Sequence, residues 1–143
     1  MRLLIGMFAL VAFPAMGQIE VEQAWARATA PGAKVAAGYM VVRNKSAAAD
    51  RLVGIASPAA ARVETHVTRR DGDIARMREV KGYDVPANGS FELKPGGAHL
   101  MFVDIRRPFH EGERIPATLT FEKAGEVRVE FHVSGLTGHG HRH

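Results

Sequence analysis

The sequence predicts an all-β domain built as a sandwich or a barrel. Short segments with alternating or continuous apolar residues recur along the chain, with turn signals every ten or so residues. No segment has a sustained apolar period of about 3.6 residues between helix caps, which a helix would require. At 143 residues the chain is long enough for one domain with a substantial core.

Turn-forming residues divide the chain into strands. Proline and glycine interrupt it at 30–32, 57–58 and 94–97, and Asp71-Gly72 is its strongest hairpin signal. The stretch 85–90 contains proline, asparagine and glycine, so we expect an irregular connection there. In chain order the expected strands are Ile19–Arg27, Val35–Arg43 (a buried central strand with Met40 in the core), Arg51–Ala56, Arg62–Arg69, Ile74–Val80, Phe91–Leu93, His99–Ile105, Ile115–Glu122 and Glu126–Val133.

The first 17 residues predict a cleaved secretory signal. Arg2 supplies a short positive region, an apolar run follows from Leu3 to Phe13, and Ala15-Met16-Gly17 has the pattern of a cleavage site. A membrane anchor is the alternative, but Pro14 interrupts the apolar run well short of the roughly 20 residues that span a bilayer. We therefore expect the mature chain to begin near Gln18, in the periplasm.

Composition excludes several classes of site. The chain has no cysteine, which argues against a lipoprotein anchor, a disulfide framework, a thiolate metal site and a cysteine nucleophile. Without Arg2, 18 of the 19 Lys and Arg residues remain against 15 Asp and Glu, and they are scattered. We expect a solvated, mildly basic surface and no nucleic-acid partner.

Four residues between positions 66 and 101 stand out by their type. After removal of the signal three methionines remain, and Met77 and Met101 lie in this stretch together with His66 and His99. Histidine and methionine without cysteine or clustered carboxylates are a soft ligand set. Such a set suits Cu(I) better than zinc, calcium or magnesium.

Strand geometry arranges these residues in two pairs. If Asp71-Gly72 is a two-residue turn, His66 faces Met77 with Cβ atoms about 4.5–5.5 Å apart. If the turn slips by one residue, Met77 becomes a diagonal neighbour of His66 on the same face. Whether this pair meets the other one does not follow from the pattern.

The second pair, His99 and Met101, shares a face of one expected strand, about 6.6–6.8 Å apart along it. Leu100 and Phe102 then point into the core. Each residue also has an ordinary explanation, because methionine commonly fills cores and a strand histidine is commonly a satisfied polar residue.

The spacing of the four residues resembles the signature of the periplasmic PCu(A)C copper chaperones. Ten residues separate His66 from Met77, twenty-one separate Met77 from His99, and one separates His99 from Met101. Flanking motifs extend the resemblance over roughly residues 19–133. They are Ala24-Trp25-Ala26-Arg27, Pro31-Gly32, Ala37-Gly38-Tyr39-Met40, Asp71-Gly72, Pro95-Gly96-Gly97 and Leu119-Thr120-Phe121.

The resemblance implies a cupredoxin-like Greek-key β-sandwich or barrel over residues 18–134. It implies that His66, Met77, His99 and Met101 bind one Cu(I), and that the protein is not an enzyme. The implied recipient is the Cu(A) centre of cytochrome c oxidase subunit II, with a Sco-type thioredoxin-fold assembly protein as a second partner. We expect a monomer without a membrane anchor. The four neutral ligands favour a monovalent ion and can be displaced one at a time by thiolates.

The tail 135–143, which we expect to be flexible, contains His139, His141 and His143. Histidine-rich tracts commonly bind metal, so the tail is a candidate accessory site for Cu(II), and Zn(II) or Ni(II) are alternatives. An incidental polar tail is the alternative interpretation.

Three other functions compete with copper delivery. A periplasmic copper buffer for resistance would use the same ligands. A copper enzyme would need an amino-terminal histidine or several histidines around an open metal position, and the core motif contains only two. An adhesion or ligand-binding sandwich would bind no metal at all.

Overall fold

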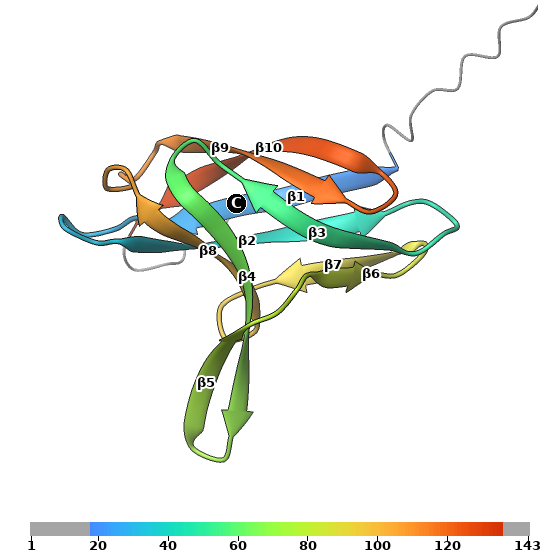
Figure 1. The fold of residues 1–143 in the computed structure, drawn as a ribbon, viewed down its shortest axis with the longest axis horizontal. Coiled ribbons are helices and arrows are strands. Elements are labelled where there is room, and N and C mark those ends of the chain that lie inside the picture. Colours follow the sequence, from blue (N-terminus) through green and yellow to red (C-terminus); the bar gives the residue numbers. More distant parts are fainter. Residues whose placement is uncertain (1–17, 136–143) are drawn as a thin grey trace, which may run out of the picture.

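The computed structural model describes residues 18–135, in which all regular elements are strands (Figure 1). The all-β prediction is thus confirmed. The strands are β1 (Ile19–Arg27), β2 (Val35–Asn44), β3 (Asp50–Ala56), β4 (Ala60–Asp71), β5 (Ile74–Glu79), β6 (Tyr83–Val85), β7 (Gly89–Leu93), β8 (Ala98–Ile105), β9 (Arg114–Phe121) and β10 (Gly125–Ser134). Across residues 18–135 there is no helix of the length and hydrophobicity needed to cross a membrane.

Seven of the strands close into a barrel. Their order is β4-β8-β2-β1-β10-β9-β3, and the pairing of Ile55 with Val63 joins β3 back to β4. Within this ring β1 and β10 run parallel and the other neighbours run antiparallel. The remaining strands are attached singly, β5 to β4, β6 to β3 and β7 to β2. Closure gives the ring strands hydrogen-bonded neighbours on both sides and so limits free edges.

Alternation along β8 separates the core from the outer surface. Phe102 is fully buried, and its ring makes edge contacts with Phe109 and Phe131 at centroid distances of 5.4 and 5.6 Å. Successive side chains of a strand point to opposite faces. His99 and Met101 therefore lie on the outer face of the barrel.

One strand, β6, was not predicted. Its last residue, Val85, falls within the stretch 85–90 that we expected to be irregular, and its three residues pair with β3, with Tyr83 opposite Leu52. An ion pair of 2.6 Å between Arg51 and Asp84 joins the same two strands. Such a short strand depends on a partner distant in sequence, so local residue patterns do not indicate it.

The β4–β5 hairpin projects from the barrel (Figure 1). Its turn is Gly72-Asp73, one residue later than the predicted Asp71-Gly72, because Asp71 still pairs with Ile74. Gly72 has a φ of 67°, a conformation that glycine adopts without steric cost, and it occupies the first loop position as in a type II′ turn.

Candidate metal centre

The barrel brings the two predicted His/Met pairs together. β4 lies between β5 and β8 in the sheet. In the register of β4 with β8, His66 is directly opposite His99, and their ring centroids are 5.5 Å apart. Glu64 is opposite Met101 in the same register. Directly opposite residues share a sheet face, so both histidines and Met101 lie on one face.

Met77 joins this face from the hairpin. It pairs with Thr68, which is two positions from His66, and it is therefore a diagonal neighbour of His66 on the same face. This is the second of the two predicted registers, and the first, with His66 directly opposite Met77, is wrong because the turn begins at Gly72. The Met77 side chain is open to solvent at 55% exposure.

His99 presents one ring nitrogen that has no partner. The residue is 4% exposed, and its Nδ1 lies 3.1 Å from the carbonyl oxygen of Gly97. A carbonyl only accepts hydrogen bonds, so Nδ1 carries the proton and Nε2 has a free lone pair. Nε2 is buried without a hydrogen-bond partner in the described part of the chain. Burial lowers the pKa of His99, which favours the neutral ring that a metal requires.

His66 has the complementary arrangement. Its Nε2 lies 2.9 Å from a carboxylate oxygen of Glu64, and Arg62 donates to the other oxygen at 2.7 Å. The hydrogen bond from His66, followed by that from Arg62, holds the pKa of Glu64 below its usual value. An ionised carboxylate only accepts, so a neutral His66 carries its proton on Nε2. Its Nδ1 is buried and, among residues 18–135, unpartnered.

Tyr83 supports the histidine pair from β6, and sequence reasoning missed it. Its hydroxyl accepts a hydrogen bond from the backbone N–H of His66 at 2.9 Å. It also lies 2.7 Å from the carbonyl oxygens of both His66 and His99, to which it can donate. Its partners are backbone groups of two other strands, so no local pattern marks it. Gly82 precedes it with a φ of 147°, and a Cβ there would overlap the carbonyl oxygen of Leu52.

Aromatic rings continue the row of side chains across the barrel. The ring centroid of Tyr39 lies 6.5 Å from that of His99 and 4.6 Å from that of Trp25. The guanidinium of Arg27 lies over both aromatic rings, 5.6 and 5.7 Å from their centroids. These distances are within the range of cation–π interactions.

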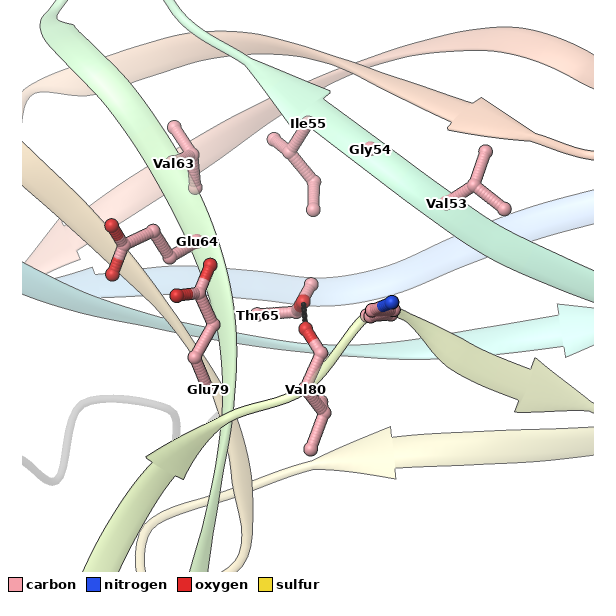
Figure 2. Close-up of a pocket in the computed structure, with 9 residues that line it drawn as sticks. Val53, Gly54, Ile55, Val63, Glu64, Thr65, Glu79 and Val80 are labelled. Carbon is pink, nitrogen blue, oxygen red and sulfur yellow. Dashed lines mark hydrogen bonds between the residues drawn. The ribbon is translucent and has the colours of Figure 1, made fainter.

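A cleft of about 610 Å³ is a different feature. It lies where β3 and β4 diverge beyond their single pair, and Figure 2 shows that Thr65 and Val80, two of its lining residues, are hydrogen-bonded to each other. Its lining includes Glu64 but none of the four predicted ligands. No cluster of three or more His, Cys, Asp or Glu side chains suited to a metal occurs within residues 18–135. A site built mainly from carboxylates therefore has no support in that range.

Two predicted features lie outside the described residues. The secretory signal falls on residues 1–17, and the histidines of the accessory site, His139, His141 and His143, fall on residues 136–143. Both stay predictions.

Comparison with known proteins agrees with this description. A family model named LpqE-like, after a lipoprotein, matches residues 19–133. The chain belongs to this family. A relative that also carries a lipoprotein name, Lxx21020 of Leifsonia xyli subsp. xyli (strain CTCB07), is 31% identical over 121 residues, or 84% of this chain and 72% of the relative. These names indicate export.

Solved structures identify the LpqE-like chain as a member of the PCuAC type. The copper-bound PCuAC domain of PmoF2 has a TM-score of 0.73 and 32% identity, over 83% of this chain and 94% of that domain. Cu(I)-bound DR1885 from Deinococcus radiodurans has a TM-score of 0.65 and 30% identity, over 85% of this chain and 83% of that protein. The predicted family and its cupredoxin-like fold are confirmed.

Proposed function

We propose that this LpqE-like protein is a copper chaperone. In this proposal His66, Met77, His99 and Met101 bind one Cu(I), and the protein delivers it to the Cu(A) centre of cytochrome c oxidase subunit II. A Sco-type assembly protein is the second proposed partner. The protein acts as a periplasmic monomer and catalyses no reaction.

The observation that carries the proposal is the pair of unpartnered nitrogens, Nδ1 of His66 and Nε2 of His99. Buried polar atoms are nearly always hydrogen-bonded, and leaving one unpaired costs about 1–3 kcal/mol. Two such atoms on directly opposite residues suggest a shared ligand. The other ring nitrogen of each histidine contacts an acceptor, as is usual for histidines that bind metals.

The chemistry of the four side chains supports Cu(I) as cargo. Imidazole and thioether are neutral and soft, so they favour a monovalent copper ion over hard divalent ions. Met77 is the most exposed of the four, whereas His99 is buried. We expect the Met77 thioether to detach first when an acceptor thiolate attacks, while the histidines still hold the ion. Transfer then proceeds by stepwise ligand exchange.

X-ray absorption of the Cu(I)-loaded protein tests the ligand set. We expect a mixed nitrogen and sulfur shell that loses sulfur in the Met77→Leu/Met101→Leu variant. Met40→Leu is the matched control, because Met40 lies in the core as predicted, at 1% exposure. A shell of nitrogen alone in the wild-type protein would move the site to the histidine-rich tail.

A periplasmic copper buffer is the second candidate, because it would use the same ligands. A deletion strain separates the two functions. Loss of cytochrome c oxidase activity that added copper restores supports delivery. Copper sensitivity with normal oxidase activity supports buffering.

His139, His141 and His143 are a proposed accessory Cu(II) site. Replacing all three by alanine should remove a second, weaker equivalent of Cu(II) in a titration and leave Cu(I) binding intact. An unchanged Cu(II) stoichiometry would contradict the accessory site.

A further inference from the structure

Residues Arg69–Arg78 form the projecting part of the hairpin, the arm. The arm has no core of its own. The pairing of β4 with β8 ends at Val67, so beyond this point only β5 accompanies β4. Every residue of the arm is exposed, and the apolar side chains of Ile74 and Met77 are 54% and 55% exposed. A lone two-stranded hairpin is marginally stable in water. The arm therefore offers both of its faces to a partner.

One face of the arm is basic. Arg69 lies directly opposite Arg76, and Arg78 shares their face, which has a single acid, Asp71. In the described part of the chain, none of these arginines has a side-chain hydrogen bond or an ion pair. Like charges directly opposite one another destabilise a hairpin, so folding stability does not account for this arrangement.

Arginines of the barrel are arranged differently. Five of them form ion pairs with carboxylates of the same chain, at distances from 2.6 to 3.4 Å: Arg43, Arg51, Arg62, Arg107 and Arg114. The guanidinium groups of the arm remain free to pair with carboxylates from another molecule.

The arm is also connected to the metal face. Met77 lies on its other face, and His66 lies at its base, where β4 pairs with both β5 and β8. Arg76 and Arg78 are the chain neighbours of Met77 but lie on the opposite face, so a molecule held by them lies across the two-stranded hairpin from this proposed copper ligand. A copper acceptor with thiolate ligands is itself anionic at its site.

We infer that the arm is the docking surface for the copper acceptor, and that it recognises an acidic protein surface beside the acceptor's metal site. This inference rests on the proposed function. Complementary charge raises association rates by factors of about 10 to 1,000 and is weakened by salt. The arginines would thus act mainly on the encounter of the two proteins, and the four ligands on copper itself.

The triple variant Arg69→Gln/Arg76→Gln/Arg78→Gln tests the inference. Its matched control, Lys34→Gln/Lys123→Gln/Arg128→Gln, removes the same number of exposed cations from the barrel. Two quantities are measured against the soluble copper-accepting domain of subunit II, at about 20 and 200 mM NaCl. They are the association of the metal-free proteins and the rate of Cu(I) transfer.

We expect association of the triple variant to be about tenfold slower than that of wild type at low salt, with a flattened salt dependence. The Cu(I) affinity of the triple variant should equal that of the control variant. Equal affinity would also show that the triple variant is folded. If the triple variant and the control associate with the subunit II domain at equal rates, the arm is not the docking surface, and the proposed copper delivery is unaffected. If wild type associates with the domain but transfers no Cu(I), the proposed delivery is wrong and the docking role of the arm is supported.

An anionic lipid surface is the other possible source of complementary charge. Vesicles of phosphatidylglycerol in phosphatidylcholine provide the comparison. If wild type binds these vesicles, the triple variant does not, and association with the subunit II domain is equal in both, the protein-docking inference is wrong. Absence of vesicle binding supports it.

Discussion

The barrel and the arm share strand β4 but are stabilised in contrasting ways. The barrel closes around buried aromatic side chains such as Phe102, whereas every residue of the arm is exposed. His66 lies at the boundary, where it pairs with His99 of the barrel and with Glu79 of β5. In the proposed function the barrel fixes the two nitrogen ligands, and the arm supplies a sulfur ligand and positive charge. Rigidity and accessibility are thus divided between two regions.

The largest expected effect is on the free energy of unfolding. Phe102→Ala removes a fully buried ring and should lower the stability by about 3–5 kcal/mol. Ile74→Ala, in the arm, should change it by less than about 0.5 kcal/mol. Urea unfolding followed by circular dichroism measures both. Similar losses in the two variants would mean that the arm has a core which the structure does not show.

Tyr83 holds the backbones of β4 and β8 together at the base of the arm, and its ionisation should destabilise the fold at high pH. Burial raises the pKa of Tyr83 to about 12, against about 10 in an unfolded chain. Its protonated form therefore contributes fully below about pH 10, and this contribution is lost as the pH rises through 12. We expect a loss of about 2–3 kcal/mol over this interval.

Urea unfolding at a series of pH values measures this loss, and Tyr83→Phe is the comparison because phenylalanine does not ionise. The stability of the variant should fall less steeply above pH 10. Parallel pH profiles for the two proteins would show that Tyr83 is not responsible.

A smaller effect concerns the tautomer of His66. Glu64→Gln replaces an acceptor by a group that can also donate, so His66 can place its proton on Nδ1 and lose the free lone pair. We expect the Cu(I) affinity to fall about 10- to 100-fold, as for other partners of metal ligands. A competition titration with a Cu(I) chelator measures it.

Glu79→Gln is the control for that variant. Glu79 lies directly opposite His66 on the same face and has no hydrogen bond to it, so its removal changes charge alone. If both variants weaken copper binding equally, the effect is electrostatic and the tautomer argument fails.

The smallest expected effect is a gain in stability. Arg69→Thr removes the like-charge pair with Arg76 and should stabilise the arm by roughly 0.2–0.5 kcal/mol. Slower hydrogen exchange of the arm amides would report this gain. Faster exchange would mean that Arg69 already has a stabilising partner.

Local patterns predicted most of the strands, because alternation and turn residues act over a few positions. They also predicted that each histidine shares a face with one methionine. They left two registers open at the hairpin, and Gly72 decided between them by taking the first loop position. The two registers differ by a shift of the turn by one residue. Which of them forms depends on the backbone conformation of the turn, which the residue types alone do not specify.

The meeting of His66 with His99 could not be predicted in the same way. It depends on the pairing of β4 with β8, two strands that are distant in sequence. The role of Tyr83 could not be predicted either, because its hydrogen bonds reach the backbone of both strands, which are distant from it in sequence. The family resemblance, rather than strand geometry, joined the two pairs in advance.

The rings of Trp25 and Tyr39 next to His99 provide an intrinsic fluorescence probe of the proposed site. Trp25 is the chain's single tryptophan, and its ring lies against that of Tyr39 at a tilt of 34°, and Tyr39 in turn lies beside His99. We expect an ion bound at His99 to alter the surroundings of this fluorophore, which lies two ring contacts away. Its emission spectrum can therefore follow occupancy of the proposed site in real time, without a label and without disturbing the arm.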